Sequence, residues 1–207
     1  MLTMDAVASE IQPGVFWWTA YHERIKQPVS SYYVADAAAL IDPMTPDEGP
    51  DWFRERGGVE RIVLTNRHHY RAGDELRKEF DCPVLCNEAG LHEFEGGPQV
   101  DGFRVGDEVA PGIVAHEMGA ICPDDTALHV AAGDGLLAFA DAVIHYGGEL
   151  MFVPDALMDD PPVVKRGVVE SLRRLCELDF GAVTFAHGEP LPQGGKRALE
   201  EFMARFA

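Results

Sequence analysis

A short apolar run that passes directly into a dense polar cluster constrains this chain more than any other feature. Ile62, Val63 and Leu64 form the apolar run, which has the length of a buried strand. The residues that follow are, in order, Thr65, Asn66, Arg67, His68, His69, Tyr70, Arg71, Ala72 and Gly73. Two histidines among Asn, Tyr and Arg make this cluster look like a metal-binding loop from which most ligands have been removed.

The segment resembles the signature of the metallo-β-lactamase superfamily, in which a strand ends in Thr and is followed by His-x-His-x-Asp-His and a Gly that opens a helix. On that pattern only His68 keeps its identity. Asn66 stands at the first His, Tyr70 at the Asp and Arg71 at the last His. The loop also resembles a less common branch that reads Thr-Asn-Arg-x-His-x-Arg, where His68 or His69 matches depending on the register.

Further segments resemble other strands and loops of the superfamily and follow in its order. They are Ile11–Trp18, Ser31–Val34, Ala39–Pro43, Val114–Ala120, Leu137–Ala142 and Val183–Gly188. Ala120 stands where a metal-binding His would be, whereas Asp141 and His187 keep the bridging Asp and the final His. The resemblance implies an α/β fold, a four-layer αβ/βα sandwich of the metallo-β-lactamase type, with residues 1–207 forming a single domain.

The altered positions determine what metal chemistry we expect. A zinc ion held by His and Asp lowers the pKa of its bound water to about 7, and it needs about three protein ligands plus an open position. Asn and neutral Tyr are poor ligands, and Arg is permanently cationic. We therefore expect no metal cofactor. If an ion binds, we expect one divalent zinc, iron or manganese at partial occupancy on His68, Asp141 and His187.

The candidate pocket consists of Asn66, His68, His69, Tyr70, Arg71, Asp141 and His187. Without metals, a buried Asp141 carboxylate would lack a counter-charge, and burying an unpaired charge is prohibitive. Arg71 carries a permanent charge on a fork that fits a carboxylate. The sequence thus predicts an Arg71–Asp141 ion pair in the former metal pocket.

Three classes of function remain open, in order of preference. The first is a pseudoenzyme with a degenerate site that binds a small molecule or serves as a structural partner. The second is a one-metal hydrolase of esters, lactones or thioesters that uses His68, Asp141 and His187. The third is a metal-independent enzyme with a His base and Arg71 as an anion clamp. The catalytic residues and the substrate stay undetermined at this level.

Charge and composition limit the kinds of partner that we expect this chain to bind. A formal net charge of −18 repels phosphate backbones and anionic lipids, so we expect no nucleic acid and no membrane partner. The first ten residues lack the basic and apolar regions of a signal peptide, and no apolar run reaches membrane-spanning length. These features predict a cytoplasmic protein. A homodimer would be the commonest oligomer.

Periodicity and turn residues place the elements along the chain. Strands are predicted at 14–18, 30–35, 38–42, 61–65, 83–86, 112–116, 126–131, 136–140 and 182–186. Helices are predicted at 50–56, 73–80, 88–94, 163–178 and 194–206. In the fourth helix, Val164, Val168, Leu172 and Leu175 form an apolar stripe suited to packing on a sheet.

Overall fold

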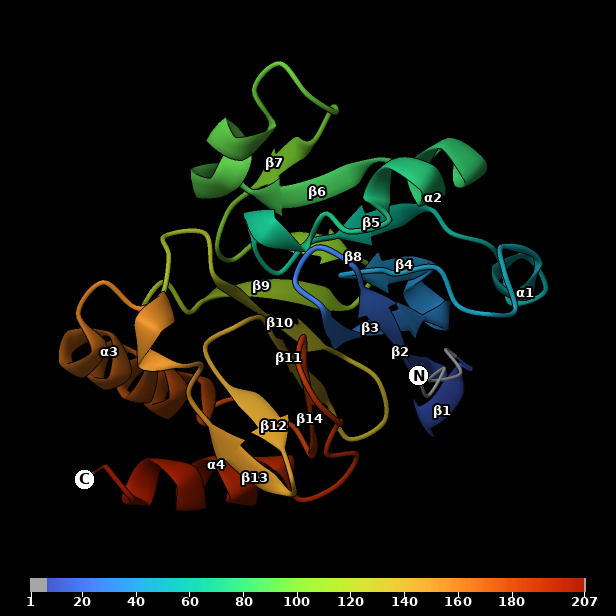
Figure 1. Cartoon of the computed structure of the whole chain (residues 1–207). Coiled ribbons are helices and arrows are strands. Elements are labelled where there is room, and N and C mark those ends of the chain that lie inside the picture. The colour runs from blue at the N-terminus through green and yellow to red at the C-terminus, as the bar shows by residue number, and fades with distance from the viewer. Residues whose placement is uncertain (1–6, 207) are drawn as a thin grey trace.

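Two large β-sheets form the centre of the computed structural model, which describes residues 7–206 (Figure 1). The first sheet has the order β1 (Ser9–Gln12), β2 (Val15–His22), β3 (Gln27–Val34), β4 (Ala39–Ile41), β5 (Arg61–Val63), β6 (Val84–Asn87) and β7 (Asp101–Phe103). The second has the order β14 (Ala182–Phe185), β11 (Leu136–Phe139), β10 (Thr126–Val130), β9 (Ile113–Glu117) and β8 (Glu108–Ala110). A separate hairpin pairs β12 (Ile144–Tyr146) with β13 (Glu149–Met151).

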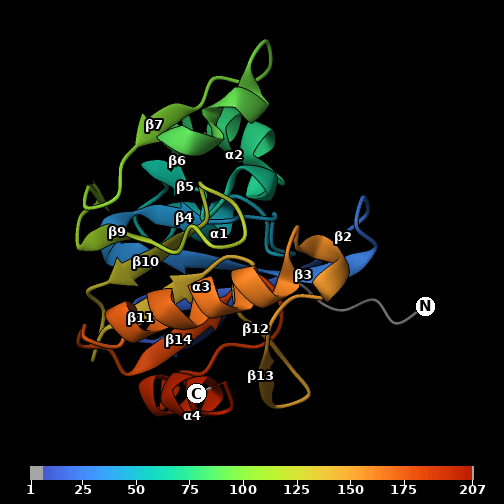
Figure 2. The ribbon, with the colours of Figure 1, turned by 90° about the vertical axis from the view of Figure 1, so that its left-hand side faces the viewer.

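Helices cover the outer faces of both sheets (Figure 2). The first sheet carries α1 (Asp51–Arg54) and α2 (Gly73–Phe80), and the second carries α3 (Pro161–Leu175) and α4 (Gly195–Ala204). Short 3-10 helices are η1 (Ala35–Ala37), η2 (Arg67–His69), η3 (Glu88–Phe94) and η4 (Asp155–Leu157). This arrangement is the four-layer αβ/βα sandwich that the resemblance implied.

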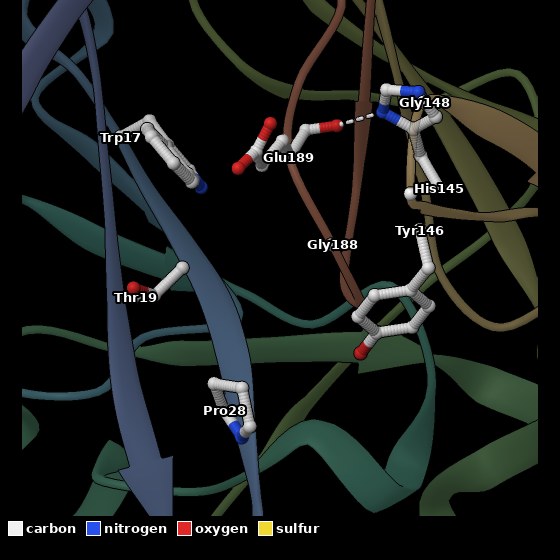
Figure 3. Close-up of a pocket in the computed structure, with 9 residues that line it drawn as sticks. Trp17, Thr19, Pro28, His145, Tyr146, Gly148, Gly188 and Glu189 are labelled. Atoms are coloured by element: carbon white, nitrogen blue, oxygen red, sulfur yellow. Dashed lines mark hydrogen bonds between the residues drawn. The ribbon is translucent and has the colours of Figure 1, made fainter. Parts of the chain in front are cut away.

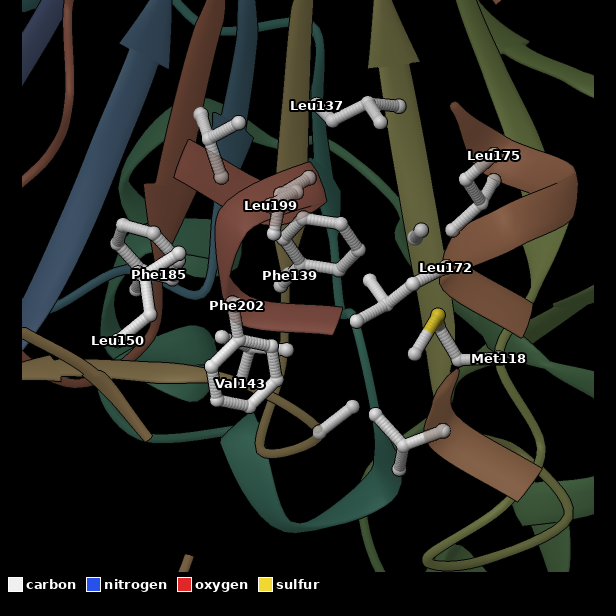
Figure 4. Close-up of a cluster of buried hydrophobic side chains, with 14 of the residues drawn as sticks. Met118, Leu137, Phe139, Val143, Leu150, Leu172, Leu175, Phe185, Leu199 and Phe202 are labelled. Carbon is white, nitrogen blue, oxygen red and sulfur yellow. The ribbon is translucent and has the colours of Figure 1, made fainter. Parts of the chain in front are cut away.

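Three apolar clusters hold the layers together, one between the sheets and one beneath each pair of helices. In the cluster under α3 and α4, Leu172, Leu199 and Phe202 pack against Phe139 and Phe185 of the second sheet (Figure 4). A fully buried Leu or Phe side chain contributes about 1.5–3 kcal/mol of hydrophobic free energy. Burial of the helix stripes therefore fixes both helices on the sheet.

Helix α3 shows why the sequence predicted it well. The side chains of its apolar stripe, Val164, Val168, Leu172 and Leu175, are all buried. Asp160 caps the first turn, since its carboxylate accepts a hydrogen bond of 3.2 Å from the backbone N–H of Val163. Two prolines follow the cap at helix positions where no N–H is needed.

Strands that the sequence analysis did not predict are β1, β7, β8, β12 and β13. Four of them contain only three residues, too few for an alternating pattern to be recognised. The predicted helix at 88–94 forms instead as 3-10 helix η3. Within the described residues, no helix is long and apolar enough to cross a membrane. Part of the N-terminal segment used to predict the location, residues 1–6, lies outside the described residues.

The two sheets are joined where the first half of β3, which extends beyond β4, approaches the end of β14. The N–H of Ser30 donates to the carbonyl of Ala186 at 2.9 Å, and the Tyr32 hydroxyl donates to the carbonyl of Phe185 at 2.8 Å. Just beyond, Gly188 lies against the backbone of His145 in β12. A Cβ at Gly188 would fall 1.7 Å from the His145 carbonyl oxygen. Only glycine fits this approach.

We predict that Gly188→Ala lowers the free energy of unfolding by about 3 kcal/mol or more, because the methyl group must push two backbones apart at a positive φ. Gly148→Ala is the matched control, since Gly148 also has a positive φ, of 80°, but no atom lies within 4 Å of the place its methyl group would take. Urea denaturation of both variants measures the difference. Equal losses of stability would contradict the close-approach argument.

Candidate functional site

The ends of four strands bring polar residues from distant parts of the sequence to one edge of the sandwich. Strands β4 and β5 are parallel neighbours in one sheet, and β11 and β14 are parallel neighbours in the other. Each strand is followed closely by a polar residue. These residues are Asp42 after β4, Thr65 and Asn66 after β5, Asp141 after β11 and His187 after β14. Helix η2 adds His69 to the same edge.

His69 lies between two carboxylates. Its Nδ1 is 2.9 Å from Oδ2 of Asp42, and its Nε2 is 3.4 Å from Oδ1 of Asp141. The Thr65 hydroxyl lies 3.0 Å from the same Nδ1 and donates to Asp42. His69 is 4 % exposed and Asp42 is 2 % exposed, so these contacts form away from water. The ring of His69 is therefore fixed in one orientation.

Asp141 is the shared partner of the site. Its Oδ1 is also 3.2 Å from Nε2 of His187, and its Oδ2 accepts a hydrogen bond of 2.9 Å from the Asn66 amide. One ligand atom each from His69, Asp141 and His187 lies within 4.8 Å of the other two. This is a spacing that one metal ion can bridge.

Electrostatics in the site favour a charged His69. Burial alone would lower its pKa, but the carboxylates of Asp42 and Asp141 outweigh burial and raise the pKa to about 9. Burial opposes ionisation of Asp141, yet His69 and the hydrogen bonds from His187 and His69 hold the pKa of Asp141 well below its usual value. Burial opposes ionisation of Asp42 as well, but the charge of His69 and its hydrogen bond lower the pKa of this carboxyl.

Arg71 does not form the ion pair with Asp141 that the sequence predicted. Its Nη1 donates to the carbonyls of Ser30 and Asp42, both at 2.6 Å, and its Nη2 donates to the carbonyl of Ala186 at 3.4 Å. In the part of the chain that the structure describes, no ion pair joins Arg71 to a carboxylate within 4.0 Å. The reason is that Asp141 is already hydrogen-bonded, whereas three backbone carbonyls converge where the sheets meet. Burial lowers the pKa of Arg71, while Asp42 and Asp141 favour its charge through space.

Two other residues of the predicted pocket lie elsewhere. His68 is exposed and does not join Asp141 and His187, so the predicted one-metal set of His68, Asp141 and His187 is wrong in its first member. On the tight turn of η2, adjacent side chains point in different directions, and His69 is the one directed inward. Tyr70 packs in the apolar cluster under α2, with its ring 5.6 Å from that of Phe94.

Asp125 is a site residue that the sequence analysis missed. It is 1 % exposed, and neither carboxylate oxygen has a hydrogen-bond partner among the described residues. Burial, followed by the charge of nearby Asp141, raises its pKa well above the usual value. Asp125 precedes β10, in the loop that also holds Ala120, which packs against Gly167 of α3. Only its position before a predicted strand could have indicated it.

Comparison with known proteins identifies the fold. Similar solved structures include the DIM-1 metallo-beta-lactamase, with a TM-score of 0.74, 16% identity and coverage of 96% of this chain and 95% of that one. A beta-lactamase domain protein from Burkholderia ambifaria has a TM-score of 0.70 and 17% identity, covering 100% of this chain and 78% of that one. A metallo-beta-lactamase from Pontibacter korlensis has a TM-score of 0.70 and 18% identity, covering 96% and 97%. The chain has the metallo-β-lactamase fold.

The sequence itself gives no closer relationship, since no family model and no curated protein matches it. The structural neighbours thus establish the architecture, and the arrangement of side chains must indicate the function.

The charged His69 predicts a specific dependence of stability on pH in metal-free protein. Its folded pKa of about 9 exceeds the ordinary value of 6.5, so its contribution is fully present below pH 6.5 and is lost as pH rises through 9. The expected loss is on the order of 3 kcal/mol. Urea denaturation in chelator between about pH 6 and 10 measures it. In His69→Asn, the free energy of unfolding should not show this decrease with pH. If it falls with pH as steeply as in the wild type, His69 is not charged in the folded protein.

Substitution of Arg71 is expected to lower the free energy of unfolding strongly. Arg71→Met keeps most of the side-chain length but removes the donors to three buried carbonyls, so we expect a loss of about 3 kcal/mol. Arg205→Met is the control, because exposed Arg205 donates to one carbonyl, that of Leu150. It should cost less than about 1 kcal/mol. If Arg71→Met is as stable as the control, the hydrogen bonds of Arg71 to the three carbonyls do not hold the two sheets together.

Proposed function

We propose that this chain is a one-metal hydrolase whose divalent ion is held by His69, Asp141 and His187. The observation that carries the proposal is the mutual approach of their three ligand atoms within 4.8 Å. Two imidazoles and one carboxylate suit zinc, iron or manganese. The substrate would be a small molecule with an ester, lactone or thioester bond.

The surroundings of the three residues fit an ion. Metal-binding His residues almost always donate their second nitrogen to a carboxylate or carbonyl, and Nδ1 of His69 faces Asp42 in this way. The side chains of Asp141 and His187 are 23% and 11% exposed, so the site can be reached from solvent. The unpartnered carboxyl of Asp125 would also be stabilised by a nearby cation.

The chain's own residues would orient the reaction. A divalent metal supplies hydroxide at neutral pH and polarises a carbonyl when it is bound. Asn66 donates to Oδ2 of Asp141 and thereby keeps Oδ1 directed at both imidazoles. Asp42 and Thr65 hold the His69 ring, so that Nε2 is the nitrogen that would bind an ion, in place of the proton it otherwise carries. Arg71 fixes the backbone to which Asp42 belongs.

A second function, metal-free binding of a small molecule, is favoured by one observation. His69 and His187 both contact the same oxygen of Asp141, so a proton on an imidazole can take the place of an ion. An enzyme that uses Arg71 as an anion clamp is less well supported, because its guanidinium already donates to three carbonyls.

Metal binding tests the proposal directly. We expect protein stripped with chelator to bind one equivalent of zinc, iron or manganese, measured by calorimetry and elemental analysis. His69→Gln should weaken binding by about 100-fold or more, since even changes outside the ligand set cost about 10–100-fold. His68→Gln is the matched control and should bind as the wild type does. No binding, or two equivalents, would overturn the one-metal assignment.

Activity is the second part of the same test. The metal-loaded protein is assayed against a panel of small esters, lactones and thioesters, and the stripped protein serves as the blank. Hydrolysis that requires the ion and is lost in His69→Gln but kept in His68→Gln supports the hydrolase. Tight binding of one ion with no hydrolysis across the panel would favour a binding protein instead.

A further inference from the structure

A cleft lies beside the candidate metal site, between the β2–β3 hairpin and the β12–β13 hairpin (Figure 3). Its volume is about 380 Å³, enough for a small molecule. Trp17, Thr19 and Pro28 form one wall. His145 and Tyr146 form the opposite wall, and the backbone after His187 lies between them.

The residues directly after His187 form the floor of the cleft, so the cleft borders the candidate site along the chain. Gly188 and Glu189 line it, and the carbonyl of His187 accepts a hydrogen bond of 3.2 Å from the N–H of His145. On the other side, Trp17 Nε1 donates to the hydroxyl of Ser30, which donates to the carbonyl of Gly188 at 2.6 Å. The ligand atoms of His69, Asp141 and His187 do not line the cleft, which borders their site only through the backbone after His187.

The side chains of the cleft suit a cation. Trp17 and Tyr146 present aromatic rings from facing walls, and Glu189 places an exposed carboxylate in the cleft on the side of Trp17. Rings of this kind attract an ammonium group through their electron-rich faces, with Trp the strongest. Within the described part of the chain, Glu189 takes part in no ion pair, so its charge is available to a ligand.

The cleft offers no matching site for an anion. None of its lining residues, as far as the structure describes the chain, is Lys or Arg. Arg24 and Lys26, the nearest basic residues along the chain, lie exposed at the turn of the β2–β3 hairpin and do not line it. Nδ1 of His145 lies 2.7 Å from the carbonyl oxygen of Glu189, so this nitrogen is already engaged by the backbone. A net charge of −18 further favours the approach of cations over anions.

We propose that this cleft binds the ammonium group of a small cationic substrate, with Glu189 as its counter-charge and Trp17 and Tyr146 as its aromatic walls. The inference rests on the proposed hydrolase and gives its substrate class, an ester, lactone or thioester that carries an amine or a quaternary ammonium. The acyl group would extend past Gly188 toward the His69, Asp141 and His187 ligand atoms.

Three probes of nearly equal shape but different charge test the cleft: choline, neutral 3,3-dimethylbutanol and anionic 3,3-dimethylbutanoate. Binding is followed by protein NMR shifts in the wild-type protein, which needs no turnover. We expect choline to bind most tightly and the anion most weakly, with shifts at Trp17 and Tyr146. Equal binding of all three, a preference for the anion, or no binding of choline would overturn the proposal.

Variants separate charge from shape. Glu189→Gln should weaken choline binding roughly fivefold and leave the neutral probe unchanged, as expected for one exposed charge. Tyr146→Leu, at a residue 36% exposed, should weaken choline by a similar factor. Glu170→Gln on the exposed face of α3 makes the same change in net charge away from the cleft and should have no effect. If Glu170→Gln weakens choline binding as much as Glu189→Gln does, the preference for choline comes from the net charge of the protein and not from the cleft.

Kinetics distinguish this inference from the proposed function. Acetylcholine and its uncharged isostere, 3,3-dimethylbutyl acetate, are compared as substrates of the metal-loaded protein. We expect a lower KM for the cationic ester, lost in Glu189→Gln with kcat kept. Hydrolysis of both esters with equal KM would contradict the cation site and leave the proposed hydrolase function standing. Choline binding in the absence of any metal-dependent hydrolysis would keep the cation site and remove the hydrolase.

Discussion

The buried carboxylate of Asp42 is the interaction on which the polar edge depends. It accepts hydrogen bonds from the N–H and hydroxyl of Thr65 and faces the ring of His69, while the backbone carbonyl of Asp42 accepts from Ser31 and Arg71. Asp42 adopts a left-handed backbone conformation with φ of 48°, a conformation that is unfavourable unless the surroundings enforce it. One residue thus joins β3, β4, β5 and η2 and sets the direction in which His69 points.

The architecture could be predicted from the sequence because its main elements are long or strongly patterned. The stripe of α3 and the full extent of α2 over 73–80 follow from helical periodicity and turn residues, and the order of strand-and-loop motifs indicated the sandwich. Short strands such as β7 and β8 are held by their neighbours in the sheet. Their own residues carry too little pattern to identify them.

The site was predicted in part, and its errors have a physical cause. Asp141, His187 and Asn66 meet as expected because each follows a strand that ends at the same edge. The choice between His68 and His69 depends on which of two adjacent residues a 3-10 turn directs inward, and spacing in the sequence does not determine this. The sequence analysis assigned Arg71 a carboxylate partner because it considered side chains only. Backbone carbonyls compete for the same N–H donors, and their positions depend on the fold.

Arg71 also makes the junction of the two sheets independent of any bound ion. Its guanidinium reaches carbonyls of β3, of the residue after β4 and of Ala186 after β14, so it closes the junction of the two sheets with a charge that is part of the chain itself. A junction held in this way is complete when the polypeptide has folded. In the hydrolase that we propose, uptake of the ion would then be a late and reversible step, governed by how much metal the surroundings supply, and the metal-free protein would already be folded.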